Sequence, residues 1–513
     1  MASTLLSQTS LTFPGLLFAT AAGLFTTLLV YRAFFHALSS IPGPLICRLT
    51  SLWTYYHSYV GDECTLIDNL HKTYGPVVRI APNEVSIADG AALAPIYVER
   101  GGFLKAPNYV NFDIEGHSTI FSTLDPAHRS VRSKAVVPVF SMTSIRSRQE
   151  TIEGCVSKLV DRLQDEAAES RKVSEATGKP QTVNVLNLTR SLALDAVSSY
   201  LFGTSFGGIN EKGDKLSATL FVDSLVAVGR FFYLPNWAFL ALELAIARFW
   251  PDHEVNESMR KVDEFASLVR SQKDDSFSYQ SRLLKAGISN HETEVQCKDL
   301  MFAVGRRPSH FHRTVLTGFQ GTDSTGTNLA TMLWHLAKRP DVYKLLRDEI
   351  AEADAQDPIY NPQSLRYLDA VVREGLRIAM ANPTRLPRIV PPQGFAFEAS
   401  DGRHYFLPSG TQVGVQIFTL HFNPKVFPDP HTFRPERWLE IPTPEMQRDW
   451  IPFGVGSRQC IARNLATVEL FLGVRAIARH NVLAGAEAIG EKVELMEWFN
   501  SKIKGEKVEL VWR

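Results

Sequence analysis

A single cysteine in a glycine-containing loop is the residue of this chain best placed to do chemistry. The stretch FGVGSRQCIARNLATVEL (residues 453–470) places Cys460 at the start of an apolar, helix-like run. The free N–H groups and the dipole of a helix N-terminus stabilise a thiolate, and Arg458 could bind an anionic ligand. Gly454 and Gly456 permit positive φ and close backbone approach. The stretch therefore predicts a thiolate that is available as a soft metal ligand.

The same residues also allow a simpler interpretation. No His or Cys lies near Cys460 in the sequence, which argues against a zinc site. A lone cysteine is commonly a small buried side chain without a chemical role. The other cysteines (Cys47, Cys64, Cys155 and Cys297) are too scattered for a disulfide framework, which indicates a reducing compartment. From these residues alone, a structural Cys460 and a metal-binding Cys460 both stay open.

The stretch around Cys460 resembles the haem-binding signature of the cytochrome P450 family, Phe-x-x-Gly-x-Arg-x-Cys-x-Gly. Phe453, Gly456, Arg458 and Cys460 match it, and Ala462 occupies the position of the last glycine. Because alanine is the smallest step from glycine, close packing of the helix on the porphyrin should survive. The resemblance implies that Cys460 is the axial thiolate ligand of haem b (iron protoporphyrin IX), whose electron donation favours O–O cleavage.

Two further motifs resemble those of the family and occur in its order. REGLR contains Glu374 and Arg377 at the family's Glu-x-x-Arg spacing, and FRPERW contains Arg437. The resemblance implies a buried network of these three side chains that holds the cysteine loop. Alone, a Glu-x-x-Arg pair usually marks a solvated helix face, so the order of the motifs carries the inference.

The two propionates of a haem would require cations. HRSVRSK resembles the family's helix in which a His or aromatic residue and an Arg four positions later bind a propionate, which implies His128 and Arg132. TRLPRIV resembles the strand after Glu-x-x-Arg and implies Arg388, and the cysteine signature implies Arg458. The simpler alternative for each of these side chains is an ordinary surface charge.

GTDST resembles the motif that the family's central helix carries over the haem. Gly321 would leave room for dioxygen, and Asp323 and Ser324 would be the acid–alcohol pair that delivers protons. Thr325 is an alternative for the hydroxyl. Another interpretation is that Asp323 and Ser324 simply cap the start of a helix.

The segment before Gly321 opposes a helix. Residues 304–320 (VGRRPSHFHRTVLTGFQ) contain Gly305 and Pro308 and have no apolar period. Without them, Ala303 would join Gly321 in a continuous helix. Their coding sequence could begin with GT, end with AG and contain a fungal-type branch sequence. We therefore predict a segment translated from an unspliced intron, the alternative being a genuine surface insertion.

Helices are expected to dominate the elements that position these motifs. The apolar period is mostly helical from residue 125 to about residue 354, and a further helix follows Cys460. VVRIA and EVSIA within residues 70–89 read as two short strands, and residues 385–420 are strand-like. We expect a mainly α fold with a minor β region, which the resemblance identifies as the cytochrome P450 fold in one large domain.

The N-terminus predicts a membrane anchor. Residues 1–31 carry no charged side chain, and residues 11–30 are apolar and long enough to span a bilayer. Arg32 follows and nothing basic precedes, so the positive-inside rule places the rest in the cytosol. A cleaved signal peptide is the alternative, but the basic n-region is missing. We predict a single-pass anchor of the endoplasmic reticulum membrane at residues 1–38 and a catalytic domain at residues 39–513.

The resemblance implies a haem-thiolate monooxygenase. Such an enzyme inserts one atom of dioxygen into a lipophilic small molecule, by hydroxylation or epoxidation, for example in secondary metabolism. Electrons would come from NADPH through NADPH–cytochrome P450 reductase, with cytochrome b5 as a further donor, and Arg129, Lys134 and Arg463 could help dock the reductase. The chain has 54 Lys plus Arg residues and 54 Asp plus Glu residues. It therefore has no excess of basic residues that would indicate nucleic-acid binding.

Two other functional classes stay open. One is a haem-thiolate isomerase or dehydratase that needs no external electrons, against which Asp323 and Ser324 argue. The other is an inactive haem-binding isoform, caused by the insertion at residues 304–320.

Overall fold

The computed structural model describes residues 13–513 except residues 115, 214–215, 217–225, 250–259, 262–263, 266–267, 270–276, 302–320 and 358. The α-helices are α1 Phe13–Val30, α2 Leu45–Leu49, α3 Leu52–Val60, α4 Glu63–Tyr74, α5 Pro126–Val136, α6 Met142–Ser147, α7 Gln149–Thr177, α8 Val185–Phe202, α10 Asn236–Phe249, α12 Tyr279–Lys285, α13 Asn290–Met301, α14 Gly321–Lys338, α15 Pro340–Gln356, α16 Arg366–Ile378, α17 Ile417–His421, α18 Pro444–Asp449 and α19 Arg463–Arg479. The strands are β1 Val77–Ala81, β2 Glu84–Ile87, β3 Leu104–Lys105, β4 Thr182–Asn184, β5 Arg388–Ile389, β6 Phe395–Glu398, β7 His404–Leu407, β8 Gln412–Val415, β9 Ala486–Ala488, β10 Leu495–Met496, β11 Lys502–Ile503 and β12 Glu509–Trp512.

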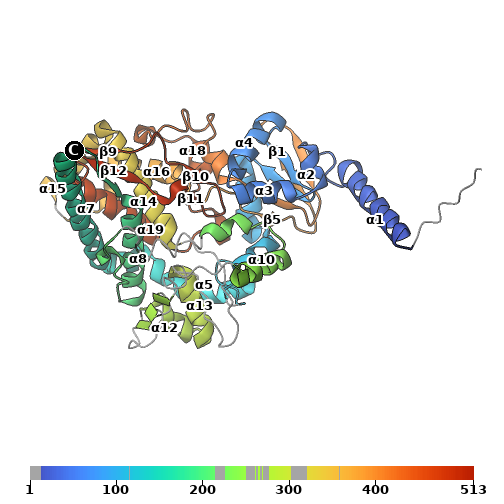
Figure 1. Cartoon of the computed structure of the whole chain (residues 1–513), viewed down its shortest axis with the longest axis horizontal. Coiled ribbons are helices and arrows are strands. Elements are labelled where there is room, and N and C mark those ends of the chain that lie inside the picture. The colour runs from blue at the N-terminus through green and yellow to red at the C-terminus, as the bar shows by residue number, and fades with distance from the viewer. Residues whose placement is uncertain are drawn as a thin grey trace, which may run out of the picture.

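The helices α7, α8, α14, α16 and α19 share one large apolar core. Leu159, Leu192, Leu333, Leu376 and Leu472, one from each of these helices, are all buried in it. The core lies away from the five-stranded sheet, and Figure 1 shows α7 and α15 at the end of the molecule opposite β1. The prediction of a mainly α fold with a minor β region is confirmed.

The main sheet brings distant segments of the chain to one place. Its strand order is β1-β2-β8-β5-β3, with β2 and β8 parallel and the other pairs antiparallel. The two strands predicted in VVRIA and EVSIA form the β1–β2 hairpin, with Val77 opposite Ile87. At the other edge, Lys105 of β3 pairs with Arg388 of β5. This pairing places two basic residues side by side near the cavity described below.

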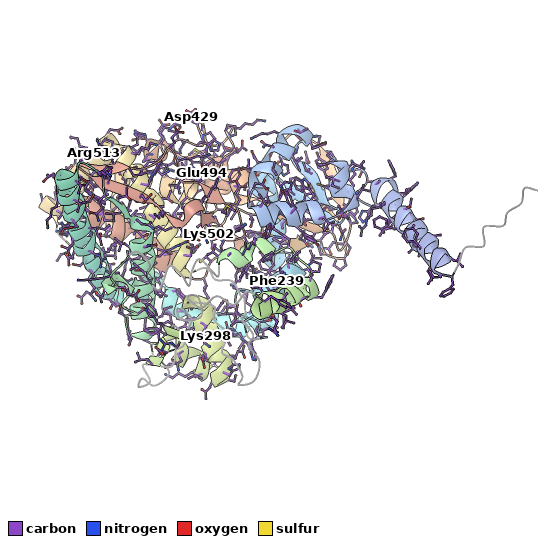
Figure 2. All side chains as sticks on the ribbon, in the orientation of Figure 1. Phe239, Lys298, Asp429, Glu494, Lys502 and Arg513 are labelled. Carbon is purple, nitrogen blue, oxygen red and sulfur yellow. The ribbon has the colours of Figure 1, made fainter. Side chains whose placement is uncertain are left out.

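The N-terminal helix stands apart from the body of the molecule. In Figure 1, α1 projects from the end that carries α2, α3 and α4, and Figure 2 shows its side chains clear of the rest of the chain. Residues Phe13–Phe35 form one continuous helical stretch, ending in a π-helical turn at Tyr31–Phe35, that is long and apolar enough to cross a membrane. None of its apolar window is buried in the fold, as expected for a helix that could anchor the chain in a membrane.

The segment predicted to derive from an unspliced intron, residues 304–320, lies outside the described residues. On either side of it, α13 ends at Met301 and α14 begins at Gly321. The two helices that would join into one continuous central helix, α13 and α14, are therefore both present.

A buried histidine fixes α4 against the sheet. His71 Nδ1 lies 2.9 Å from the Gly75 carbonyl oxygen, and Nε2 lies 2.9 Å from Ser86 Oγ of β2. The carbonyl can only accept, so Nδ1 carries the hydrogen and the serine hydroxyl donates to Nε2. Burial lowers the pKa of His71 to about 4, although Gly75 and Asp68 act in the opposite direction. The folded state therefore requires a neutral ring.

We expect the stability of the protein to fall on acidification because of this requirement. In the unfolded chain His71 binds a proton below the ordinary histidine pKa of about 6.5, whereas in the folded chain it does so only near pH 4. Between pH 7 and pH 5 the wild type should lose about 2 kcal/mol relative to His71→Gln, which should itself be less stable by ~1–3 kcal/mol at pH 7. Urea titrations of both proteins at the two pH values measure this difference, and a constant difference would contradict it.

Candidate functional site

The loop that carries Cys460 is closed by backbone hydrogen bonds. The Gly454 N–H donates to the Ile451 carbonyl at 2.9 Å, and the Cys460 N–H donates to the Phe453 carbonyl at 3.0 Å. Gly454 and Gly456 have φ of 67° and 78°. Both glycines, which were expected to permit positive φ, adopt it, and the loop folds back on itself before α19 begins.

The two glycines of the loop differ in what surrounds them. A Cβ on Gly456 would lie 1.9 Å from the carbonyl oxygen of Tyr97, in the π-helical turn η3 (Ala94–Val98). A Cβ on Gly454 would meet only Leu386 Cδ1, at 3.7 Å. The loop therefore rests on η3 at Gly456, and the Ser457 hydroxyl donates to the Gly101 carbonyl at 2.7 Å in the same region.

Cys460 lies three residues before the first residue of α19 and faces a cavity. The Cys460 side chain is solvent-accessible although it lies deep within the protein. Both are true because its accessible side faces the internal cavity. Burial raises the pKa of the Cys460 thiol, while the Ala462 N–H and Arg463 oppose that rise. Ala462 has φ of −92° at the N-cap of α19, so its backbone conformation does not require glycine.

The cavity has walls of different chemical character. One side of the cavity is formed by the loop that carries Cys460, residues 451–462, which we call the ligand loop. It contributes Phe453, Arg458, Cys460 and Ala462. Ser324, Thr325 and Asn328 of α14 form a second side, and Tyr109, Phe121 and Phe499 contribute aromatic rings. These rings belong to a larger aromatic cluster in which Phe112 and Phe232 stack at 5.1 Å. The cavity thus joins a thiol, hydroxyl groups and an apolar wall.

Four basic side chains line the same cavity. They are Lys105, Arg129, Arg388 and Arg458. Burial and then the charges of Arg129 and Arg388 lower the pKa of Arg458 to about 10, and its Nη1 has no hydrogen-bond partner within the described part of the chain. Burial and then the charges of Arg388, Arg458 and Arg129 also lower the pKa of Lys105. Cations that repel one another in the same cavity would be stabilised by an anion, and the two carboxylates of a haem fit this requirement.

His128 and Arg132, predicted to bind a propionate, do not reach the cavity. Both side chains pair with Glu292 of α13: His128 Nε2 lies 3.5 Å from its carboxylate, and Arg132 Nε also contacts it. Arg129, which was expected on a surface that docks a reductase, lines the cavity instead. One residue along α5 turns a side chain by about 100°. The expected residues therefore face α13, and their neighbour faces the site.

The predicted acid–alcohol pair is divided between two environments. Ser324 and Thr325 line the cavity, but Asp323 accepts a hydrogen bond from Arg190 Nε of α8 at 2.8 Å and forms an ion pair with its Nη2 at 2.7 Å. Arg190 and Asp323 are both buried. The Thr327 hydroxyl adds a third contact to Asp323, at 3.3 Å. The carboxylate is thus held behind the cavity wall by a partner that no motif in the sequence indicated.

A glycine that the sequence did not single out permits this ion pair. A Cβ on Gly326 would lie 2.7 Å from both Cα and Cγ of Arg190. The Thr189 hydroxyl also donates to the Gly326 carbonyl, at 2.9 Å. Only glycine allows α14 and α8 to approach so closely, so Gly326 fixes the position of Arg190 beside Asp323.

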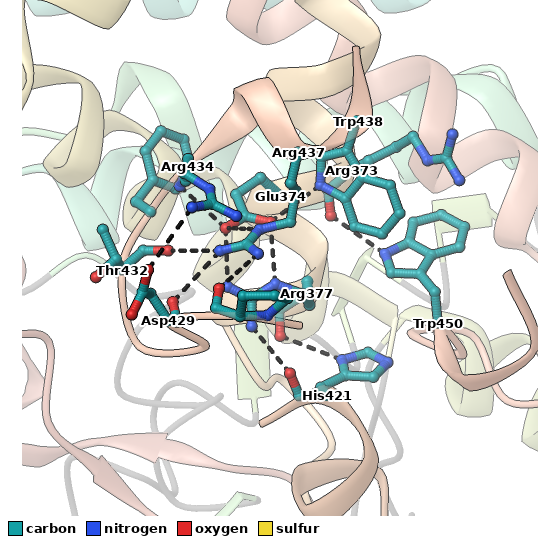
Figure 3. A network of polar contacts seen from close by, with 12 residues as sticks. Arg373, Glu374, Arg377, His421, Asp429, Thr432, Arg434, Arg437, Trp438 and Trp450 are labelled. Carbon is teal, nitrogen blue, oxygen red and sulfur yellow. Dashed lines mark hydrogen bonds and ion pairs between the residues drawn. The ribbon is translucent and has the colours of Figure 1, made fainter. Parts of the chain in front are cut away.

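The structure brings Glu374, Arg377 and Arg437 together in a buried network (Figure 3). Arg377 Nε and Nη2 donate to the two carboxylate oxygens of Glu374 at 2.9 and 2.8 Å, and Arg437 Nε donates at 3.1 Å. The Arg434 N–H and Trp438 Nε1 each donate at 3.0 Å. Burial opposes the ionised form, but the hydrogen bonds and charge of Arg377, and then Arg437, outweigh it and lower the pKa of Glu374.

Comparison with known proteins agrees with this geometry. The model of the cytochrome P450 family matches residues 42–481. The chain belongs to the cytochrome P450 family. It is therefore a monooxygenase, and a haem cofactor is implied by its family.

Similar proteins come from fungi. The chain is 38% identical over 522 residues to cytochrome P450 monooxygenase mfmF of Annulohypoxylon moriforme, covering 96% of this chain and 98% of that protein. It is 30% identical to the fusicoccadiene C-8 hydroxylase of Alternaria brassicicola (87% and 85% covered). It is 27% identical to a pisatin demethylase of Fusarium vanettenii (88% and 86% covered). These relatives support a monooxygenase role in fungal secondary metabolism.

The different surroundings of the two loop glycines lead to a testable difference. We expect Gly454→Ala to incur only the strain of a left-handed residue, ~1–2 kcal/mol. Gly456→Ala adds a clash with the Tyr97 carbonyl, so the loop or η3 must move and haem content should fall at least about tenfold. The haem-to-protein ratio and the thermal midpoint of each purified variant measure this. Equal losses in the two variants would contradict the assigned role of the Tyr97 contact.

Proposed function

We propose that this P450 uses Cys460 as the axial thiolate ligand of haem b and inserts one atom of dioxygen into a lipophilic small molecule. The observation that carries the proposal is the cavity that Cys460 shares with the basic side chains of Arg129, Arg388 and Arg458 and with an apolar aromatic wall. When bound, haem would supply dioxygen activation and oxygen-atom insertion. The protein would supply the ligand, the propionate partners, a proton route and the exclusion of water.

The assignment of the propionate partners follows from the cavity lining. Arg129, Arg388 and Arg458 would hold the two carboxylates, and Arg458 Nη1 offers a donor without a partner among the described residues. Phe453, Gly456 and Ala462 would pack the ligand loop against the porphyrin. This assignment replaces His128 and Arg132, whose side chains are held by Glu292.

Proton delivery would depend on the hydroxyl groups of Ser324 and Thr325. Both line the cavity, so either Oγ could donate a hydrogen bond to a group bound above the thiolate. Asp323, on the same turn of α14, would replace the proton that a hydroxyl gives up. Arg190 holds the Asp323 side chain, so this contact would have to open before Asp323 could pass a proton to either hydroxyl.

Electrons would come from NADPH through NADPH–cytochrome P450 reductase, with cytochrome b5 as a further donor. Lys134 and Arg463 are exposed and could contribute to docking, whereas Arg129 lies in the cavity. The anchor at residues 1–38 would hold the catalytic domain, residues 39–513, on the cytosolic face of the endoplasmic reticulum membrane. Hydroxylation or epoxidation in secondary metabolism fits the relatives, one of which is a hydroxylase.

The ligand assignment can be tested with the ferrous carbon-monoxide difference spectrum. We expect a thiolate-type Soret band in the wild type and none in Cys460→Ser. Cys155→Ser should keep the band, because Cys155 lies outside the cavity in the core against Ser199. If both cysteine variants keep the band, Cys460 is not the ligand. Substrate turnover that continues without reductase and NADPH would instead favour the isomerase or dehydratase class.

We also propose that residues 304–320 are absent from the mature active enzyme. The helices that would be joined, α13 and α14, end and begin close to the two boundaries of the segment. Expressed in parallel, the chain that lacks residues 304–320 should give the thiolate-type band with a higher haem content than the full chain. Sequencing the mature transcript provides the second measurement. If every mature transcript contains the nucleotides that encode residues 304–320, the intron hypothesis is wrong. If the two chains give equal spectra, the fold tolerates the insertion.

A further inference from the structure

A buried histidine connects the Glu374 network to the start of the ligand loop. His421, the last residue of α17, is 1% exposed. Its Nδ1 lies 3.2 Å from the carbonyl oxygen of Arg377, and its Nε2 lies 2.9 Å from the backbone nitrogen of Ile451. The carbonyl can only accept and the Ile451 N–H can only donate. The ring must therefore carry its hydrogen on Nδ1 and accept at Nε2, which only the neutral form can do.

The surroundings of His421 favour this neutral form. The Arg377 guanidinium is close, since its Nη1 donates to the His421 carbonyl at 2.9 Å, and Phe427 packs against the ring. Burial and then the charge of Arg377 lower the pKa of His421, to about 3, while the Arg377 carbonyl and Glu374 act weakly in the opposite direction. Both hydrogen bonds are thus present over the whole physiological range of pH.

A second contact of the same kind lies next to it. Trp450 Nε1 donates to the carbonyl of Arg373 at 3.2 Å, and the Arg373 guanidinium lies 5.1 Å from the centre of the Trp450 ring. Arg373 and Arg377 are one helical turn apart on α16. Two consecutive residues, Trp450 and Ile451, are therefore tied to successive turns of α16, as Figure 3 shows for Trp450 and His421.

The ties continue from Ile451 to the cysteine without a break. The Ile451 carbonyl accepts from Gly454 at 2.9 Å, and the Phe453 carbonyl accepts from Cys460 at 3.0 Å. A shift of the Ile451 amide would thus move the segment that ends at the thiol. The imidazole ring of His421 connects the Ile451 amide to Arg377, which belongs to the Glu374 network.

We propose that His421 is a positioning residue that fixes the start of the ligand loop on α16 and so sets the position of the Cys460 thiolate. Its importance for the thiolate rests on the proposed function. Its hold on Ile451 does not, because that hold is a property of the protein chain alone. His421 is not among the residues that line the cavity, and its ring reaches the loop through the backbone N–H of Ile451.

The test compares His421→Phe with a matched variant, His335→Phe. Phenylalanine keeps the ring but removes both hydrogen bonds of His421. His335 is also a neutral interior ring near Glu374, with its pKa lowered by burial to about 4, and it stacks on Phe433 at 4.7 Å. Hydrogen exchange of the peptide containing Ile451, measured by mass spectrometry, should become at least about tenfold faster in His421→Phe and stay unchanged in His335→Phe.

The spectrum of the haem-loaded protein provides the second readout. At equal haem content, the fraction of the ferrous carbon-monoxide complex with a thiolate-type Soret band should fall by half or more in His421→Phe only. Unchanged exchange at Ile451, or equal changes in both variants, would overturn the proposal. If His421→Phe does not fold, His421→Gln, which retains a donor and an acceptor, should show an intermediate acceleration confined to the same peptide. A wild type without the thiolate-type band would refute the proposed function, while the exchange data would still decide the role of His421.

Discussion

A single buried carboxylate holds the parts of this site in their relative positions. Glu374 is fully buried, and an isolated charge in such a place would be strongly unfavourable. It is stabilised by two guanidinium groups, a backbone N–H and an indole N–H, which come from α16 and from residues 434–438. Because removal of one partner of a buried ion pair typically costs ~3–5 kcal/mol, these segments cannot separate independently. The ligand loop is attached to this unit through Trp450 and His421.

The cavity has the opposite electrostatic character. Five N–H groups donate to Glu374, whereas the cavity is lined by several basic side chains (Lys105, Arg129, Arg388 and Arg458) and, among the described lining residues, by one carboxyl group, that of Asp299. Burial first, and then the repulsion among these cations, lowers the pKa of Arg458 and of Lys105. A ligand with two carboxylates would relieve this repulsion, so binding of such a ligand and stability of the cavity should be coupled. The fold thus contains one carboxylate that is saturated with donors and one group of cations that is suited to a dianionic ligand.

Close backbone approach is the second condition for the geometry of the site. Gly456 lets the ligand loop rest on the Tyr97 carbonyl, and Gly326 lets α14 approach Arg190 of α8. In both places a methyl group would occupy space that is already filled. The loop that carries the thiol and the helix that carries the hydroxyl groups therefore each depend on one close backbone contact that only glycine permits.

The sequence by itself determined the local features of this protein. The glycines before Cys460, the β1–β2 hairpin, the helix after the cysteine and the apolar N-terminal helix follow from residue types at short spacing, because backbone conformation and periodicity act over a few residues. The motif resemblance added Glu374, Arg377 and Arg437, which the fold brings into contact.

Only the tertiary structure decided which charges face one another. Sequence reasoning chose His128 and Arg132, but the rotation of α5 against α13 turned them to Glu292 and turned Arg129 to the cavity. It could not find Arg190 beside Asp323 or His421 beside Ile451, since the partners lie 133 and 30 residues apart. Such contacts depend on how whole helices pack, and that packing is set by the shared core rather than by any local pattern of residues.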